Sequence, residues 1–249
     1  MKFSIITVSY NSSDTIADTI HSVSGQSHPD TEYLIIDGAS GDGTLKILDS
    51  LRDKIDILIS EADQGIYHAM NKGIEKAGGD VIGILNSDDV YADELVLSDV
   101  AKLFENQETE AVYADLVYVE RSDTGKIKRK WVSGDYTHGD FRKGWMPPHP
   151  TFFVQRSIYD KYGTFNLDFS SAADYELMLR FIHKHQIKIA YLPRVIIKMR
   201  VGGQSNVTLK NRLKANKEDQ KAWEVNGIKP GKFTFIRKPL SKLGQFFKK

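Results

Sequence analysis

The first ninety residues alternate between short β-branched runs and stretches in which apolar residues recur at helical spacing. The β-branched runs predict strands at 3–8, 33–36, 55–60 and 81–85. The other stretches predict helices over 12–23, 45–51 and 66–74. In a repeated strand–helix–strand unit the strands pair in parallel and the helices pack on the faces of the sheet. The pattern therefore predicts an α/β fold with a mostly parallel central sheet flanked by helices.

Beyond residue 89 the pattern becomes mixed. A hairpin is predicted from 111–120 and 126–132, and the three prolines within 146–150 predict an irregular loop. The remaining predicted elements are a helix over 173–184, a strand at 187–192 and a helix over 206–223. We expect a single domain over 1–225, followed by a basic, aromatic and helical tail at 226–249.

A polar tetrad, Asn86-Ser87-Asp88-Asp89, follows directly on the strand predicted at 81–85. Ligands of open α/β sheets bind where strands leave the sheet at their carboxyl ends. Carboxylates are hard oxygen donors that suit Mg²⁺ or Mn²⁺ carrying a diphosphate. The alternative is a turn in which an Asp caps a helix that begins near 94–97.

Three other residues are expected at the same edge of the sheet. Tyr10, Asp37 and Gly65 lie at or just past the ends of the first three predicted strands, as Asp88 does for the fourth. An aromatic ring and a carboxylate in one crevice could hold a nucleobase by stacking and hydrogen bonding. Tyr10 could instead be a core aromatic that covers the sheet, and Asp37 could form an Asx turn.

Five motifs occur in order along the chain, at 5–11, 36–44, 60–67, 70–73 and 85–89. Together they resemble those of glycosyltransferase family 2, and the resemblance extends over roughly residues 2–200. It implies the GT-A Rossmann-like fold, with a nucleotide-sugar half at about 1–90 and an acceptor half at 91–205.

The resemblance also implies a reaction. An inverting enzyme of hexosyl- or N-acetylhexosaminyltransferase type would move the sugar of a nucleotide diphosphate sugar to a hydroxyl of an oligosaccharide or lipid-linked acceptor in cell-surface polysaccharide biosynthesis. The residues implied to contact the nucleotide sugar are Val8, Tyr10, Asp37, Asn71, Lys72, Asn86 and Asp88. Asp88 and Asp89 are implied to hold Mn²⁺ or Mg²⁺. Two positions depart from the family pattern, because Asn86 and Gly38 stand where many members carry Asp.

Asp174 is the position that matches the family's catalytic carboxylate. It lies three, four and seven residues before Leu177, Met178 and Phe181, so it shares their inward stripe on the predicted helix. Glu176 falls off this stripe and is expected to face solvent. The alternative for Asp174 is a helix-dipole partner in the first turn, a contribution of only ~0.3–1 kcal/mol.

Weaker candidates for acceptor or phosphate contacts follow from residue type. A Gly-Gly pair before Ser can offer backbone N–H groups to a phosphate, but it can also form an ordinary turn. An indole can form a stacking wall for an acceptor sugar, and a histidine between prolines can be a ligand or a structural residue. These candidates are His149, Trp145, Gly203 and Ser205.

Charge is distributed unevenly along the chain. Residues 177–249 hold 18 Lys and Arg against three acidic residues, although the net charge of the whole chain is only +1. Residues 228–249 contain seven basic residues, no acidic ones, and interleaved Phe and Leu. This composition predicts an anchor on an anionic membrane surface, with a helix that docks on the domain as the alternative. No nucleic-acid recognition motif accompanies the basic residues.

Absent features narrow the function further. The chain has no cysteine, which excludes disulfides and thiolate metal sites, and the sequence shows no signal peptide. We therefore expect a cytoplasmic protein, peripheral on the inner face of the cell membrane. The Gly-rich turn of a Rossmann dehydrogenase is missing after the first strand. A non-catalytic carbohydrate- or nucleotide-binding scaffold of the same fold is the other alternative, but it would have no need for Asp88, Asp89 and Asp174 together.

Overall fold

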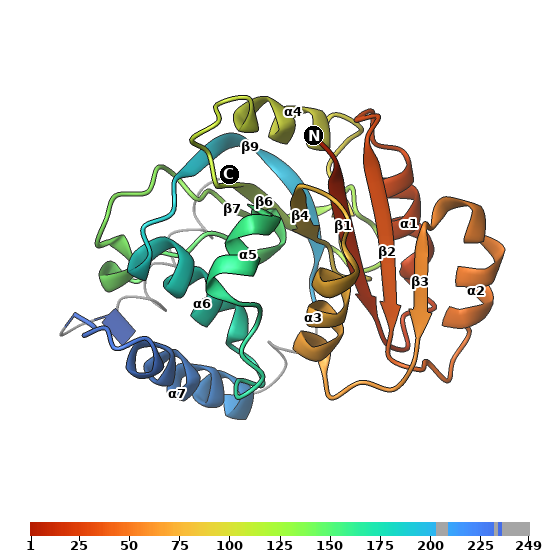
Figure 1. The fold of residues 1–249 in the computed structure, drawn as a ribbon. Coiled ribbons are helices and arrows are strands. Elements are labelled where there is room, and N and C mark those ends of the chain that lie inside the picture. The colour runs from red at the N-terminus through yellow and green to blue at the C-terminus, as the bar shows by residue number, and fades with distance from the viewer. Residues whose placement is uncertain (203–208, 232–233, 236–249) are drawn as a thin grey trace.

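One nine-stranded sheet runs through the computed structural model, which describes residues 1–202, 209–231 and 234–235 (Figure 1). The strand order is β3-β2-β1-β4-β8-β6-β9-β5, and β7 pairs with β6 outside this path. The first four strands are β1 (Phe3–Ser9), β2 (Thr31–Asp37), β3 (Ile57–Ser60) and β4 (Val81–Ile84). All four are parallel, as the sequence predicts.

The carboxyl ends of three of these strands are level with one another. Ser9 at the end of β1 is opposite Asp37 at the end of β2, and Asp37 is opposite Ser60 at the end of β3. On the other side of β1, Ile6 pairs with Ile84, the last residue of β4. The loops that follow the four strands therefore leave the sheet along one edge, where the polar motifs lie.

The second half of the sheet is mixed. Its strands are β5 (Val90–Tyr91), β6 (Ala111–Val119), β7 (Ile127–Trp131), β8 (Phe153–Gln155) and β9 (Ile189–Arg200). The predicted hairpin is β6–β7, while β8 lies antiparallel between β4 and β6 and joins the two halves. The strand predicted at 187–192 extends to Arg200 because it pairs with the full length of β6. The two- and three-residue strands β5 and β8 are too short to produce a period in the sequence.

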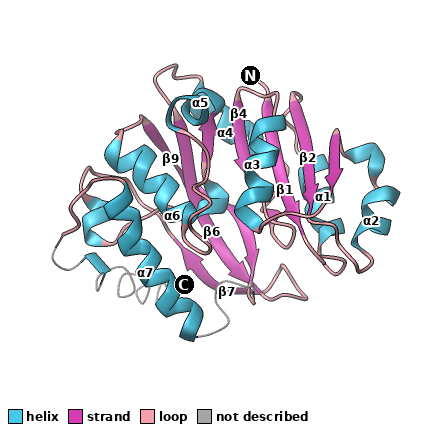
Figure 2. Ribbon diagram, turned by 60° about the horizontal axis from the view of Figure 1, so that its bottom comes forward, coloured by secondary structure: helices cyan, strands magenta, loops and turns pink. Residues whose placement is uncertain are grey.

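Helices cover both faces of the sheet (Figure 2). The α-helices are α1 (Ile16–Ser24), α2 (Thr44–Ser50), α3 (Ile66–Lys76), α4 (Val96–Phe104), α5 (Arg156–Tyr162), α6 (Ala173–Met178) and α7 (Leu209–Val225). Alternate residues of β1 enter two separate cores: Phe3 and Ile5 pack with residues of α1 and α4, whereas Ile6 and Val8 pack with residues of α3 and α6. This two-residue period is what a strand with helices on both faces requires.

The predicted helix at 173–184 is divided. It begins as α6 and continues as a π-helical segment, η4 (Leu179–Lys184). Three short 3₁₀ segments complete the described elements: η1 (Arg52–Lys54), η2 (Asp140–Lys143) and η3 (His149–Thr151). None of the helices in the described ranges is long and apolar enough to cross a bilayer.

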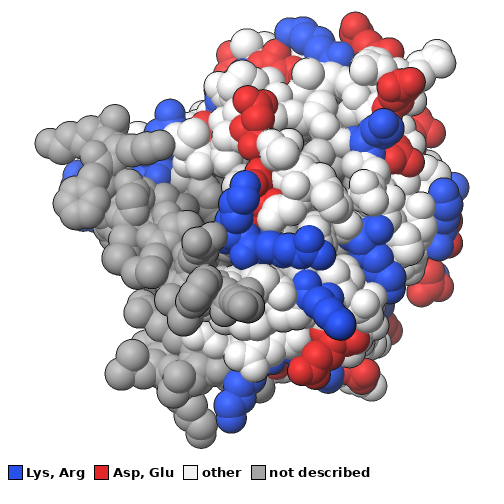
Figure 3. Space-filling view, turned by 90° about the vertical axis from the view of Figure 1, so that its left-hand side faces the viewer, with Lys and Arg blue, Asp and Glu red and all other residues white. Residues whose placement is uncertain are grey.

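The chain beyond α6 folds back on the second half of the domain. α7 matches the helix predicted over 206–223 from residue 209 onward, and it lies beside α6 (Figure 1). Trp223 of α7 is fully buried, and Thr234 donates a hydrogen bond of 2.7 Å to the carbonyl of Arg142. Most of the predicted tail lies outside the described residues. Figure 3 shows a band of Lys and Arg side chains on one face of the described part of the molecule.

A close approach in β4 gives a test of this packing. A Cβ on Gly83 would lie 2.5 Å from Cε1 and 2.8 Å from Cδ1 of Phe153, the buried β8 residue that packs over β4. We expect Gly83→Ala to lower the free energy of unfolding by ~1–3 kcal/mol, the usual cost of overpacking a core. Urea denaturation measures this loss.

Gly41→Ala is the matched control, because a Cβ at Gly41 would meet no atom within 4 Å. The control should leave stability unchanged or raise it by ~0.4–1 kcal/mol. Equal effects of the two substitutions would show that β4 and β8 are not packed as described.

Candidate active site

A buried carboxylate, Asp37, ties together the ends of β1, β2 and β3. Its Oδ1 accepts hydrogen bonds from the hydroxyls of Ser9 (2.9 Å) and Ser40 (2.6 Å). Its Oδ2 accepts from the backbone N–H of Ser40 (2.9 Å) and the hydroxyl of Ser60 (2.8 Å). Asp37 has no exposed surface. It therefore fixes the turn after β2, and its contact with a nucleobase stays a prediction.

Tyr10 is exposed to solvent just past the end of β1. Its side chain is 60% exposed, so it is not the core aromatic considered as an alternative. A Cβ on Gly38 would lie 2.6 Å from Oδ2 of Asp63 and 3.3 Å from Cδ2 of Tyr10. Gly38 thus lets an aromatic ring and a carboxylate approach the same point. Asp63 was not singled out from the sequence, although it belongs to the motif at 60–67. Val8, by contrast, has its side chain in the core.

Two predicted nucleotide contacts, both on α3, have partners within the protein. The Asn71 amide donates to the carbonyl of Phe165 and accepts from its N–H, both at 2.9 Å. The Lys72 ammonium lies 2.8 Å from a carboxylate oxygen of Glu61. Asn71 therefore joins α3 to the segment before α6. The predicted nucleotide contacts of both residues remain untested.

The two carboxylates after β4 have different environments. The Asp88 side chain is 27% exposed and lies 3.9 Å from the Arg121 guanidinium. Asp89 is 1% exposed and accepts hydrogen bonds from the Arg200 N–H and the Asn86 amide, both at 3.2 Å. Burial raises the pKa of both carboxyls, and the charge of Asp88 raises the pKa of Asp89 further. Asp88 is the accessible member of the pair, and Asp89 supports the turn.

The tetrad is not the start of a helix. β5 follows it directly, and α4 begins only at Val96 without a side-chain cap. The helix-cap alternative for Asp88 and Asp89 is therefore wrong.

The side-chain oxygen of Asn86 differs from the other polar atoms of this turn. This atom, Oδ1, is buried and has no hydrogen-bond partner. A buried polar atom without a partner is costly, and a bound group commonly satisfies it. Asn86 and Asp88 offer oxygen donors, which fit a divalent ion or the hydroxyls of a nucleotide sugar. No cluster of three or more His, Cys, Asp or Glu that could hold a metal ion occurs in the described part of the chain.

Arg200, at the end of β9, holds this turn in place from the opposite half of the chain. Its guanidinium is buried, donates to the carbonyls of Asp88 (2.9 Å) and Arg121 (3.0 Å), and pairs with Asp18. This role of Arg200 could not be predicted from the sequence, because the partners are about eighty to 180 residues away.

Asp174 lies near the start of α6 and receives a hydrogen bond of 3.1 Å from the hydroxyl of Tyr67 on α3. Tyr67 stacks on Phe165 (ring centroids 5.5 Å apart), and His149 meets the same ring edge-on at 5.7 Å. Burial lowers the pKa of His149, while the charge of Asp174 opposes this shift. The N-cap of α6 is Ala172, whose side chain cannot cap the helix, and the Asp174 carboxylate accepts a hydrogen bond from Tyr67.

The remaining weak candidates lie apart from this cluster or outside the described residues. The Trp145 indole donates to the carbonyl of Ser133 (2.8 Å) and packs on Tyr136, with ring centroids 4.8 Å apart. Trp145 is half-buried and belongs to an aromatic layer beneath the acceptor half. Gly203 and Ser205 lie outside the described residues.

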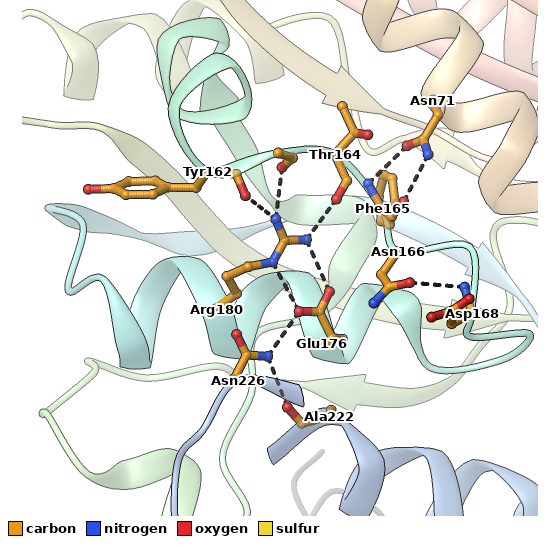
Figure 4. A network of polar contacts seen from close by, with 11 residues as sticks. Asn71, Tyr162, Thr164, Phe165, Asn166, Asp168, Glu176, Arg180, Ala222 and Asn226 are labelled. Carbon is orange, nitrogen blue, oxygen red and sulfur yellow. Dashed lines mark hydrogen bonds and ion pairs between the residues drawn. The ribbon is translucent and has the colours of Figure 1, made fainter. Parts of the chain in front are cut away.

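The prediction that Glu176 faces solvent is wrong. Glu176 is 2% exposed and forms two hydrogen bonds of 3.0 Å with Arg180, while Asn226 donates a third of 2.9 Å. Figure 4 shows this network, in which Arg180 also reaches the carbonyls of Tyr162 and Thr164 (Figure 4). Helical period alone could not reveal this burial, because α7 covers the side of α6 that would otherwise be open.

Comparison with known proteins agrees with this geometry. The family model for glycosyl transferase family 2 matches residues 4–169. Rv1514c of Mycobacterium tuberculosis (strain H37Rv), an uncharacterized glycosyltransferase, is 32% identical over 193 residues, which cover 71% of this chain and 67% of that protein. TuaG of Bacillus subtilis, assigned as a teichuronic acid biosynthesis glycosyltransferase, is 44% identical over 91 residues, which are 35% of this chain but only 36% of TuaG.

Solved glycosyltransferases share the fold. Staphylococcus aureus TarS in complex with UDP-GlcNAc superposes with a TM-score of 0.70 at 17% identity, covering 91% of this chain and 65% of the TarS chain. The mannosyltransferase PcManGT of Pyrobaculum calidifontis, with GDP-Man and Mn²⁺, gives 0.69 at 17% identity and covers 98% of this chain and 69% of its own. These matches confirm the predicted GT-A fold.

The structural role of Asp37 can be tested without any ligand. Asp37→Ala would leave four donors without their acceptor, three of them buried, so we expect the free energy of unfolding to fall by at least ~2 kcal/mol. Chemical denaturation of the nucleotide-free protein measures the change.

Asp49→Ala is the matched control, since Asp49 is an exposed carboxylate on α2. It should change stability by no more than ~0.5 kcal/mol. If Asp37→Ala behaved like the control, the four contacts would contribute nothing to folding.

Proposed function

The chain belongs to glycosyl transferase family 2, and we propose that it transfers a hexosyl or N-acetylhexosaminyl group, with inversion, from a nucleotide diphosphate sugar to a glycan hydroxyl. The observation that carries this proposal is the position of two accessible carboxylates at the carboxyl edge of the sheet. Asp88 follows β4, and Asp174 reaches the same edge through its hydrogen bond with Tyr67 at the start of α3. One carboxylate would hold the metal ion that binds the donor diphosphate, and the other would take the proton of the acceptor hydroxyl.

The donor site consists of the exposed Tyr10 ring, the Asp63 carboxylate beside Gly38, and Asn86 with its unpartnered oxygen. Among the structural neighbours, TarS is in complex with UDP-GlcNAc, and PcManGT is in complex with GDP-Man and Mn²⁺. Asp88, supported by Asp89, would hold Mn²⁺ or Mg²⁺. When bound, the ion neutralises charge on the diphosphate leaving group.

Asp174 would take the acceptor proton. The acceptor oxygen attacks the anomeric carbon, the bond from that carbon to the diphosphate breaks, and the proton passes to the Asp174 carboxylate. Carboxyl groups, with an ordinary pKa of ~4, are too weak as bases to ionise an alcohol beforehand, so the proton moves during the attack. Such general base catalysis contributes ~10²–10⁴-fold.

Tyr67 orients the proposed base. Its hydroxyl donates to Oδ1 of Asp174, which leaves the second oxygen for the acceptor. The ring of Phe165 stacks on Tyr67, and His149 packs against Phe165 in turn. These aromatic groups would also form the apolar wall beside the acceptor hydroxyl, where water competes least.

The acceptor is proposed to be a lipid-linked glycan of cell-surface polysaccharide synthesis, reached at the inner face of the cell membrane. TuaG is assigned to the synthesis of such a polymer. Figure 3 shows a band of Lys and Arg side chains on one face of the described part of the molecule, and the sequence holds five Lys and Arg within 236–249. Basic residues near an anionic lipid surface contribute up to ~1 kcal/mol each.

Donor binding is tested first by thermal shift. Purified protein is titrated with UDP, GDP, dTDP and CDP, with and without Mn²⁺. We expect one nucleotide to raise the melting temperature only when the metal is present, because Asp88 and the diphosphate share it. Asp88→Ala should abolish that shift.

Asp174→Asn is the control for a role in chemistry rather than binding. It should keep the nucleotide shift and lose transfer by ~10²–10⁴-fold. Absence of a shift with every nucleotide would contradict the proposal and favour a non-catalytic scaffold of the same fold.

Membrane association is tested by sedimentation with vesicles. Truncation after Phe235 removes the last fourteen residues but keeps Thr234 and its hydrogen bond to the carbonyl of Arg142. We expect the truncated protein to lose binding to vesicles that contain phosphatidylglycerol and to keep its nucleotide shift. Replacing the five basic residues of 236–249 by Gln in the full chain separates charge from aromatic insertion. Vesicle binding that is unchanged by truncation would refute the anchor.

A further inference from the structure

Glu218 of α7 accepts hydrogen bonds from the residues that come just before α6. Its Oε1 accepts from the N–H (3.2 Å) and the hydroxyl (2.6 Å) of Ser170. Its Oε2 accepts from the N–H (2.8 Å) and hydroxyl (3.0 Å) of Ser171, and from the N–H of Ala172 (2.9 Å). Burial alone would raise the pKa of Glu218, but these hydrogen bonds lower it below its ordinary value. A charged carboxylate from another helix thus supports the start of α6.

This arrangement leaves Asp174 free for other contacts. The first N–H groups of a helix need acceptors, and an acidic residue in the first turn commonly supplies one. Here Glu218 takes the donors that precede the helix, and the Asp174 carboxylate bonds to Tyr67 instead. Without Glu218, unpaired donors two to four residues from Asp174 would compete with Tyr67 for its oxygens.

α7 also supports the next turn of α6. The Asn226 amide is buried and donates to Glu176 (2.9 Å) and to the carbonyl of Ala222 (2.9 Å), as Figure 4 shows. The Trp223 indole donates to the hydroxyl of Tyr175 at 2.9 Å. Two side chains of α7, and that of Asn226 just after the helix, therefore bond to α6 or to the residues just before it.

Hydrogen bonds connect Glu176, through Arg180, to the segment that carries the aromatic residues near Asp174. Glu176 holds Arg180, and Arg180 donates to the carbonyls of Gly163 (3.0 Å) and Thr164 (2.7 Å). The next residue, Phe165, is held by Asn71 and stacks on Tyr67. The hydrogen-bond donor of Asp174 is thus positioned by the same network as α6 itself (Figure 4).

We propose that α7 is a positioning element for Asp174, and that Glu218, with Asn226 in support, is a positioning residue for the transfer reaction. The inference rests on the proposed function, and it concerns a part of the chain beyond the family-model match at 4–169. Shifts of about 1 Å in a catalytic group can cost ~10²-fold in rate. Binding of the donor should not depend on α7, because the donor residues lie on the loops after β1, β2, β3 and β4.

Glu218→Gln is the test, because it keeps the size of the side chain and removes its charge and part of its acceptor capacity. We expect kcat for transfer to fall by ~10–10²-fold, while the donor KM and the nucleotide thermal shift stay unchanged. Asn226→Ala should give a smaller loss of the same kind. Glu224→Gln is the matched control, since Glu224 is an exposed carboxylate on the same helix.

A double mutant separates positioning from general stability. In an Asp174→Asn background, Glu218→Gln should cause no further loss of transfer, because the group that it positions is already gone. Multiplicative losses, or an unchanged kcat in Glu218→Gln with a lowered melting temperature, would overturn the inference and leave the proposed function standing. Absence of transfer by the wild-type protein with every nucleotide sugar tried would overturn both.

Discussion

The level ends of β1, β2 and β3 depend on one buried charge. Asp37 has no exposed surface, and an ionised carboxylate is tolerated in such a place only when its oxygens are saturated with hydrogen bonds. Ser9 and Ser60 stand opposite it in register on the two flanking strands, so their hydroxyls reach it only if the three strands end together. The carboxylate therefore keeps the ends of the three strands level at the edge where the donor residues lie. It also links the turn at Ser40 to that edge.

The acceptor half depends on a different constraint, the passage from a parallel to a mixed sheet. β8 can lie antiparallel beside β4 because Gly83 leaves room for the Phe153 ring. β6 then pairs with β8, and β9 pairs along the full length of β6, which brings Arg200 at its end to the turn at Asp88. The donor turn is consequently held by residues from both halves of the chain.

Periodicity predicted the parts of the fold that are regular and locally encoded. The four parallel strands and the three helices between them follow from two- and 3.6-residue periods, and the polar residues at the strand ends follow from the topology. The partners of those residues could not be predicted this way. Arg200 on Asp88, Glu218 before α6, and Asp63 beside Gly38 all depend on how segments far apart in the chain pack. The burial of Glu176 was missed for the same reason, since it is α7 that covers it.

The way in which the carboxylates are partnered distinguishes structural from reactive ones. Asp37 is saturated by neutral donors, Asp89 by an amide and a backbone N–H, and Glu176 by an arginine and an amide. Each is almost fully buried. Asp88 instead has an arginine at 3.9 Å, and Asp174 receives a hydrogen bond from a tyrosine hydroxyl at 3.1 Å. Because saturated carboxylates can neither bind a ligand nor take a proton without breaking contacts that hold the fold, Asp88 and Asp174 are better suited than Asp37, Asp89 and Glu176 to a metal-bound diphosphate and to an acceptor hydroxyl.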